Sequence, residues 1–419
     1  MANVSSSNGI EKRPKLQFRD ANEQLFPAWK RYRFDVLYKP VSEKNDLSYG
    51  VESIISVANM YFKPDARISD PEYLRTYNIF KYGDIAFEGN KSKSYANGRF
   101  VENTIGDGIV SHVFNVLRPL SQTHNLEYWK YAINNENVMG RILARCTKKT
   151  TMMTNLVSAD FLEQEIFCPV ESEQDKIALF LSLIEKRLIA QEQLVEHLKK
   201  YKRGVSKRFF EEIHNNQNCE AKQFSEVFEL IQNNTFSREC LTDENTDVLN
   251  VHYGDILVKY GSVLDPDIDT VPFIKSGTDL SKFSGSSYLQ DGDVIFADTA
   301  EDYTVGKMCE IINVSNRKIL SGLHTMPFRP TITFAPMYLG YYLNSAAFRT
   351  QILPMIQGAK VSSISKSEMK NTIIHIPSIE RQTEIVGILN ALDKRIKRTE
   401  LILAELKEMK KGLLQNLFI

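Results

Sequence analysis

The sequence lacks the features of membrane, secreted and metal-stabilised proteins. It has no run of about 18 uninterrupted apolar residues, so no membrane-spanning helix is expected. Its first residues contain no apolar stretch of the kind that a secretory signal needs, and we expect a cytoplasmic protein. The five cysteines are widely spaced and form no C-x-x-C pair, which makes a zinc site or a redox motif unexpected.

Motifs that accompany catalysis are also missing. The sequence contains no G-x-x-x-x-G-K-[ST] phosphate loop, no G-x-G-x-x-G cofactor turn and no H-E-x-x-H metal pair. An amino-methyltransferase needs two consecutive prolines in its base-holding motif, whereas SDPEY at 69–73 has one. The acidic segment DPDIDT at 265–270 is typical of a solvated turn. We therefore expect a protein that is not an enzyme, uses no cofactor and holds no metal.

An excess of positive charge is absent as well. The 52 Lys and Arg residues balance 52 Asp and Glu residues, and the formal net charge is 0. This balance weighs against a chain that holds DNA tightly by itself through phosphate neutralisation. The 42% of apolar and 25% of charged residues are typical of a folded globular protein, and 419 residues suggest about two or three domains.

An internal repeat is the strongest signal in the sequence. The segment from Pro169 to Phe210 aligns without a gap on the segment from Pro377 to Phe418, at a shift of 208 residues, and 12 of the 42 aligned positions are identical. The match extends upstream, where YGDIAFEG at 82–89 resembles DGDVIFAD at 291–298. Further matched residues are Arg118 with Arg329, Tyr128 with Tyr338, Tyr131 with Tyr341, and Asn134 with Asn344. A whole unit was duplicated, and each copy is predicted to be a globular domain followed by a long helix.

Both repeated segments carry apolar residues at heptad spacing, which predicts one apolar seam on each helix. The two seams are interrupted at the same layers, by Gln191 and Thr399 and then by Lys202 and Lys410. Polar residues at seam positions reduce stability but fix register, so the helices are predicted to pack on each other in one alignment. The seam residues expected to hold the helices or a partner are Leu181, Ile184, Leu188, Leu198, Leu389, Leu392, Ile396 and Leu406.

The predicted fold class is α+β. Two mixed globular domains, at residues 20–165 and 220–375, are each followed by a helix, at 170–212 and 378–419. The two helices are expected to form an antiparallel coiled coil with pseudo-two-fold symmetry. Ser172 and Ser378 are candidate N-caps or turn residues ahead of acidic first turns.

These features resemble the specificity subunits of type I restriction-modification enzymes over nearly the whole chain. The resemblance rests on the opening PKLQFRD, on the helix entries PVESEQDKI and PSIERQTEI, and on the helix endings KKYKRG and KEMKKG. It implies a non-catalytic subunit with two target recognition domains that binds double-stranded DNA at bipartite sites. It also implies two methyltransferase subunits and, for restriction, translocase-nuclease subunits as partners.

Polar and basic loops are the candidates for contacts with DNA bases, although a solvated surface loop is the alternative for each of them. In the first domain they lie in GNKSKSYANGRF and CTKKTT, and in the second in EDYTVGK and GAKVSS. The candidate residues are Lys91, Lys93, Tyr95, Asn97, Arg99, Lys148, Lys149, Tyr303, Lys307 and Lys360.

Two other classes of protein share part of this pattern. A coiled-coil scaffold, or a DNA-binding protein of a related defence system without restriction activity, would also have paired helices. A pure scaffold, however, would not need two large globular copies. The helices match closely while the domains hardly match, as expected when each domain reads a different DNA sequence.

Overall fold

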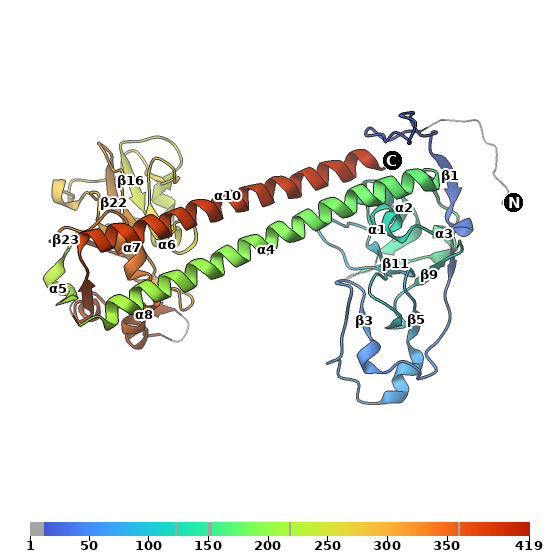
Figure 1. Ribbon diagram of the computed structural model, residues 1–419, viewed down its shortest axis with the longest axis horizontal. Coiled ribbons are helices and arrows are strands. Elements are labelled where there is room, and N and C mark those ends of the chain that lie inside the picture. Colours follow the sequence, from blue (N-terminus) through green and yellow to red (C-terminus); the bar gives the residue numbers. More distant parts are fainter. Residues whose placement is uncertain (1–11, 122–123, 150–152, 218, 359–360) are drawn as a thin grey trace. The chain divides into compact units, whose positions relative to one another are not determined.

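Two mixed globular domains and two long helices make up the part of the chain that the structure describes, residues 12–121, 124–149, 153–217, 219–358 and 361–419 of a computed structural model. The long helices are α4 (Glu171–Asn215) and α10 (Ile379–Leu417) (Figure 1). The chain divides into unit 1, Met1–Glu192 with Leu401–Ile419, and unit 2, Gln193–Glu400. Each unit therefore joins one globular domain to parts of both helices.

A four-stranded antiparallel sheet forms the centre of the first domain, in the order β2-β9-β6-β7. These strands are β2 (Tyr38–Pro40), β6 (Ile85–Glu88), β7 (Arg99–Glu102) and β9 (Val116–Pro119). Strand pairs around it are β1 (Lys30–Arg33) with β12 (Glu165–Cys168), β3 (Ile55–Ser56) with β4 (Tyr61–Phe62), β5 (Asn78–Phe80) with β8 (Gly108–Val110), and β10 (Thr147–Lys149) with β11 (Thr154–Leu156). The helices are η1 (Phe34–Val36), η2 (Val51–Ser53), η3 (Pro71–Thr76), α1 (Leu126–Ala132), α2 (Glu136–Cys146) and α3 (Ser158–Leu162).

The second domain repeats this sheet and enlarges it. Its central order is β14-β23-β19-β21, followed by the added strand β17 (Val263–Leu264). The four repeated strands are β14 (Phe228–Leu230), β19 (Val294–Ala297), β21 (Met308–Ile311) and β23 (Thr325–Pro330). A further sheet contains β15 (Leu241–Thr242), β16 (Val248–Val251), β18 (Phe273–Ile274) and β22 (Lys318–Ser321). Two strand pairs are β13 (Glu220–Gln223) with β25 (Ile373–Ile376) and β20 (Thr299–Ala300) with β24 (Ser362–Ser363). The helices are α5 (Phe224–Val227), η4 (Arg238–Cys240), α6 (Tyr253–Val258), η5 (Gly285–Ser287), α7 (Tyr338–Leu343), α8 (Ala346–Ile352), η6 (Leu353–Met355) and α9 (Lys366–Met369).

The turn that enters the central strand has the same construction in both domains. Gly83 and Gly292 adopt φ values of +86° and +89°, where a Cβ atom would be strained. The aspartate that follows each glycine, Asp84 or Asp293, is buried. It accepts a hydrogen bond from the backbone N–H three residues earlier, at 2.8 Å and 2.7 Å respectively. The repeated Gly-Asp pair in the sequence is therefore a structural turn.

An arginine closes each of these turns from the neighbouring strand. Arg118 donates from Nε and Nη2 to the two carboxylate oxygens of Asp84, both at 2.8 Å. Arg329 makes the same bidentate contact with Asp293, at 2.9 Å and 2.6 Å. Burial raises the pKa of both aspartates, while the arginines oppose this shift. The matched arginines of the repeat hold the frame of each domain together.

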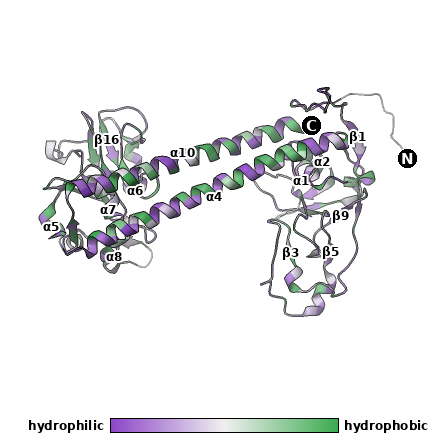
Figure 2. Cartoon of the chain, viewed as in Figure 1, coloured by the Kyte–Doolittle hydropathy of each residue, from purple (hydrophilic) through white to green (hydrophobic). Residues whose placement is uncertain are grey.

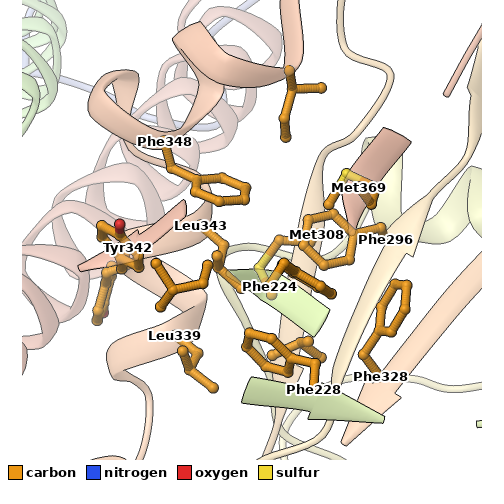
Figure 3. Packing of buried hydrophobic residues seen from close by; sticks show 14 of the residues in the cluster. Phe224, Phe228, Phe296, Met308, Phe328, Leu339, Tyr342, Leu343, Phe348 and Met369 are labelled. Atoms are coloured by element: carbon orange, nitrogen blue, oxygen red, sulfur yellow. The ribbon is translucent and has the colours of Figure 1, made fainter. Parts of the chain in front are cut away.

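The apolar cores include residues from the long helices. In unit 2, aromatic side chains from β19, β23, α5 and α8 fill the space between the sheet and α7 (Figure 3). Phe210 of α4 joins this core, 6.1 Å from the ring of Tyr338. In unit 1, its repeat equivalent Phe418 joins the other core, 5.6 Å from the ring of Tyr128. Each domain is therefore anchored on the helix pair through equivalent aromatic contacts.

The helix entries share one polar contact and differ in their caps. Gln174 and Gln382, identical in the repeat, donate to the carbonyl oxygens of Pro169 and Pro377 at 3.1 Å and 2.9 Å. Ser378 lies directly before α10 and its hydroxyl accepts from a first-turn backbone N–H at 3.4 Å, as an N-cap does. Ser172 lies inside α4, so its predicted role as a cap or turn residue is wrong. Both helices begin at equivalent residues, Glu171 and Ile379, and Val170 stands where Ser378 stands in the second copy; the carbonyl of Val170 accepts from the backbone N–H groups of residues 173 and 174.

Apolar and polar residues alternate along both long helices (Figure 2). Within unit 2, Lys199 of α4 contacts Glu400 of α10 at 2.7 Å. Within unit 1, Glu192 of α4 contacts Lys407 of α10 at 2.8 Å. Earlier residues of one helix therefore face later residues of the other, and the pairing is antiparallel. The predicted fold class is confirmed by these elements and their packing. None of the described helices has the length and apolar character needed to cross a membrane.

Candidate nucleic-acid interface and helix seam

The first candidate loop connects β6 to β7 and combines exposed and anchored side chains. Lys91 and Lys93 are exposed. The Tyr95 hydroxyl donates to Asn134 Oδ1, and Asn97 Nδ2 donates to the carbonyl of residue 140 at 3.3 Å. Arg99 Nε donates to Glu88 at 2.7 Å, and its guanidinium lies 5.0 Å from the centre of the Tyr95 ring. The loop thus presents its lysines outward from a base that is held by its later residues.

The second candidate loop of this domain lies beside the first. Lys148 and Lys149 belong to β10 and are exposed, while the loop tip, 150–152, lies outside the described residues. Across the hairpin, the backbone N–H and hydroxyl of Thr154 donate to the carbonyl of Gly89 at 2.8 Å and 3.0 Å. A Cβ atom at Gly89 would meet the Thr154 carbonyl oxygen at 2.0 Å, which explains the glycine. The structure therefore brings the two loops together at one edge of the domain.

The candidates of the second domain have different surroundings. Tyr303 is 81% exposed, and the carbonyl of this residue accepts a hydrogen bond from Arg349 at 2.8 Å. Lys307 is half-buried and donates from Nζ to the carbonyl of Leu257 at 2.9 Å. Burial lowers the pKa of Lys307. Lys360 lies outside the described residues.

A charged cluster in the second domain did not emerge from the sequence. Asp255 is buried and accepts from Arg238 at 2.7 and 2.8 Å, with Lys259 at 3.0 Å. Burial acts to raise the pKa of Asp255, but the hydrogen bonds from both cations outweigh it and lower the pKa. Half of the Arg238 side chain is exposed. A lone arginine in SREC gave no signal of this contact, because its partner lies 17 residues away on another element.

The predicted seam residues are largely removed from solvent, and Leu181 and Leu389 pack in the cores of the first and the second domain. Six of the eight predicted residues are buried, Leu181, Ile184, Leu188, Leu198, Leu389 and Ile396. The other two, Leu392 and Leu406, are half-buried. In unit 1, the amine of Lys410 contacts Glu185. In unit 2, the amine of Lys202 contacts Asp393 at 2.5 Å. The two lysines that interrupt the seams therefore each have an acidic partner on the opposite helix.

A cavity borders the lysine in each unit. Tyr341, Asn344 and Lys202 line one of about 580 Å³ in unit 2. In unit 1, Tyr131, Asn134 and Lys410 line one of about 500 Å³. The same three residue types come from equivalent positions, so the duplication preserved this junction between domain and helices. Among the described residues, no group of three or more His, Cys, Asp or Glu side chains is arranged to hold a metal ion.

Residues 216–408 match the family described as the type I restriction modification DNA specificity domain. A type I restriction enzyme MjaX specificity subunit of Methanocaldococcus jannaschii is 25% identical over 210 residues, which cover 48% of this chain and 46% of that protein. The chain thus spans about half the length of the curated relative that it matches.

Solved structures resemble the chain over nearly its whole length. The S subunit of a type I restriction-modification system from M. genitalium is 16% identical, with a TM-score of 0.53 over 97% of this chain and 99% of that one. The HsdS subunit from Thermoanaerobacter tengcongensis is 16% identical, with a TM-score of 0.51 over 95% and 98%. A chain from a structural study of complex assembly in the type I R-M system is 16% identical, with a TM-score of 0.57 over 92% and 96%. These proteins share the fold of this chain.

Proposed function

We propose that this chain, in which residues 216–408 match the type I restriction modification DNA specificity domain family, recognises a bipartite DNA site for a type I restriction-modification complex. The resemblance to specificity subunits that the sequence predicts is confirmed by this match, by the curated relative and by the solved S subunits.

The proposal rests on a central sheet that is repeated in both domains and on outer elements that differ between them. Both domains have the same order of four central strands and the same Arg–Asp pair. Within the residues that the structure describes, only the second adds β17 and the sheet of β15, β18, β16 and β22. A constant frame with variable attachments suits two domains that occupy equivalent places on two half-sites and read different bases.

In the first domain, the DNA-facing edge is proposed to be the pair of loops that Thr154 holds together. The exposed lysines Lys91, Lys93, Lys148 and Lys149 would meet phosphates or base edges there. Tyr95, Asn97 and Arg99 shape the first of these loops through internal contacts. They are proposed to act in recognition mainly by setting its conformation.

In the second domain, Tyr303 and Lys360 are proposed to contact DNA. An exposed aromatic ring such as that of Tyr303 can pack against sugar or base atoms. Lys307 donates to a backbone carbonyl, so its proposed role is to hold the loop that carries Tyr303. The segments that carry Tyr303 and Lys360 are adjacent to strands β20 and β24, and these two strands pair with each other. The two candidate loops of the first domain are likewise joined to each other.

The helices are proposed to bind two methyltransferase subunits and, for restriction, translocase-nuclease subunits in the cytoplasm. In unit 1, Leu179 and Leu183 of α4 and Leu401 of α10 are more than half exposed. In unit 2, Tyr201 is 62% exposed and Ile388 is 38% exposed. Exposed apolar side chains on otherwise polar helices support a protein-binding surface. A net charge of 0 fits a subunit whose partners supply much of the DNA affinity.

Replacement of one domain tests the bipartite proposal. We exchange residues 20–165 for the corresponding domain of another specificity subunit, co-express the methyltransferase subunit and map methylated adenines across the genome. One half of the recognised sequence should change, while the other half and the spacer stay the same, because well-separated contacts add independently. The matched control exchanges residues 220–375 and should change the opposite half. A change in both halves from one exchange would contradict separate reading.

The proposed non-catalytic role of the chain has its own test. The purified chain with S-adenosylmethionine should transfer no methyl group to DNA, and it should bind cognate duplex weakly. Both activities should appear when the methyltransferase subunit is added. Methyl transfer by the chain alone would refute the non-catalytic role.

A further inference from the structure

A cluster of three polar residues lies where the second domain meets both helices in unit 2. The amine of Lys202 from α4 donates to Asp393 of α10 at 2.5 Å. It also lies 5.2 Å from the centre of the Tyr341 ring, which belongs to α7 of the globular domain. The Tyr341 hydroxyl donates to the other oxygen of Asp393 at 2.9 Å. Three separate elements are therefore joined through one lysine, one acid and one tyrosine.

An equivalent cluster lies in unit 1, with the helices in exchanged roles. The amine of Lys410, now from α10, contacts Glu185 of α4. It lies 5.9 Å from the centre of the Tyr131 ring, which belongs to α1 of the first domain. Burial and the nearby Glu185 raise the pKa of Tyr131 to about 12. The same residue types again join both helices to a globular domain.

The repeat relates the two clusters residue by residue. The shift of 208 residues carries Lys202 onto Lys410 and Glu185 onto Asp393, and the tyrosines match at 210. The side chains are also equally exposed, 23% and 38% for Lys202 and Asp393 against 24% and 39% for Lys410 and Glu185. Preservation of all three members through a duplication in which most domain residues changed indicates that the cluster has a role of its own.

The apolar part of the seam cannot by itself determine one alignment. Leucine and isoleucine recur every seven residues, so a slide of one heptad would again place apolar side chains opposite each other. Such a slide moves one helix by about 10 Å along the other, at about 1.5 Å per residue, which is about three base pairs of DNA. Any slide of one helix past the other separates at least one member of each cluster from its partners. The clusters therefore distinguish one register from the next more strongly than the more exposed ion pairs of Lys199 with Glu400 and Glu192 with Lys407 do.

We propose that Lys202 and Lys410 are positioning residues that lock both helices and the adjacent domain in one register, and that they thereby fix the spacer length between the two half-sites. This inference rests on the proposed function for the meaning of the spacer. The lysines contact no DNA in this scheme. They determine specificity by excluding the neighbouring registers.

The test uses the chain in complex with its methyltransferase subunit. We replace both lysines by methionine, Lys202→Met with Lys410→Met, because methionine fills the space and suits an apolar seam. Methylation rates are measured on duplexes that carry the cognate half-sites with spacers altered by one to three base pairs in either direction. Discrimination against altered spacers should fall by roughly tenfold or more, since one charge-assisted contact in each unit no longer separates the registers.

Three further variants distinguish a change of register from a general loss of structure. The control Lys199→Met with Lys407→Met removes the other repeat-related ion pairs of the same helices, which are more exposed, and it should leave spacer discrimination unchanged. Charge exchange, Lys202→Glu with Asp393→Lys and Lys410→Glu with Glu185→Lys, should restore the discrimination that Lys202→Glu with Lys410→Glu alone abolishes. A role in stability alone would not produce recovery of spacer preference in the exchanged pair.

The possible results separate this inference from the proposed function. A methionine variant that assembles normally and keeps full spacer discrimination overturns the role of the lysines. A wild-type complex that methylates no two-part site contradicts the proposed function instead. In that case, disulfide trapping tests register without DNA. Lys199→Cys should cross-link with Glu400→Cys in the otherwise wild-type chain, and with Lys407→Cys only in the methionine variant. Absence of this shifted cross-link overturns the register role.

Discussion

Glu102 in the first domain and Glu310 in the second occupy the same place in the repeated sheet and have different partners. Glu102 lies opposite Ile85 and Glu310 lies opposite Val294, the first residues of equivalent strands. Both glutamates are buried. The carboxylate of Glu310 accepts two backbone hydrogen bonds at the start of α7, at 2.6 Å and 2.8 Å. In the part of the chain that the structure describes, neither carboxylate oxygen of Glu102 has a hydrogen-bond partner.

The cause lies in the loop before the helix. In the second domain, Met337 precedes α7 with φ of 72° and provides no side-chain cap, so Glu310 serves the backbone N–H groups instead. In the first domain, Asn125 caps α1 by accepting from the backbone N–H of Tyr128 at 2.9 Å. The backbone N–H of Tyr128 therefore has an acceptor other than Glu102. Burial raises the pKa of Glu102 to about 9 and that of Glu310 to about 7, where the backbone hydrogen bonds oppose the rise.

This difference shows that loops changed while the frame was retained. The acid is present at the equivalent strand position in both domains, although in the first domain Asn125 caps the helix and no described group bonds to Glu102. The central strands and their ion pairs are common to both domains, whereas the loops around them differ. Such an arrangement suits domains whose loops recognise different DNA sequences on one scaffold.

Loss of the shared ion pair should have the largest effect, and it should be equal in the two domains. Arg118→Met and Arg329→Met each leave a buried aspartate without its bidentate partner. Each should lower the free energy of unfolding of its unit by about 3 kcal/mol or more. Urea titration followed by circular dichroism measures both. A large loss in one domain and none in the other would show that the frames are not energetically equivalent.

The same substitution at the two glutamates should act in opposite directions. Glu310→Met removes two charge-assisted hydrogen bonds and should lower the free energy of unfolding at pH 8 by about 2 kcal/mol. Glu102→Met removes a buried polar group without partners and should raise it by roughly 1 kcal/mol. Urea titration of the two variants and of the wild type measures both changes in the free energy of unfolding. Destabilisation by both substitutions would mean that Glu102 has a stabilising partner after all.

The pH dependence should separate these glutamates further. Folding raises both pKa values from an ordinary 4.5, so the folded carboxyls keep protons that the unfolded chain has lost. The contribution of each group to stability therefore falls by about 1.4 kcal/mol per pH unit as pH rises. For Glu310 the fall should end near pH 7, and for Glu102 near pH 9. The difference between wild type and each methionine variant, measured from pH 5 to about 9, isolates the two groups. Parallel curves above pH 7 would contradict the assignment.

The helix cap should have the smallest effect. Asn125→Ala removes the side-chain acceptor at the start of α1 and should lower the free energy of unfolding of unit 1 by about 1 kcal/mol. Asn125→Ser keeps an acceptor there and should lose only a few tenths of this. Equal losses in thermal melts of the two variants would assign the effect to the contact of Asn125 with Asp175.

The repeated parts of the fold could be predicted from the sequence, because periodicity and duplication are visible in one dimension. The heptad residues Leu188 and Ile396 are buried, and the polar layers at Lys202 and Lys410 are paired within each unit. The candidate loops were harder to interpret. An internal contact, such as that of Arg99 with Glu88, depends on strand register.

The difference between the two glutamates shows the same limit. Glu102 is the last residue of β7 and Glu310 the last but one of β21, and neither local sequence indicates which partners the carboxylate has. Their partners are determined by a loop that lies farther along the chain. Sequence patterns therefore locate the frame, whereas the partners of buried polar groups require the three-dimensional arrangement.

The first domain contains a contact that spans most of the sequence. Asn135 donates to the carbonyl of Leu414 at 2.9 Å, across a separation of 279 residues, and Leu417 and Phe418 are buried in the same core. During synthesis, this core stays incomplete until the ribosome has produced the second domain and nearly all of α10. The nascent first domain therefore keeps part of its apolar surface exposed until then, and we expect its early folding to be slow and to depend on chaperones. A premature stop codon after residue 400 would consequently unfold a domain encoded far upstream, even though every residue of that domain had been translated correctly.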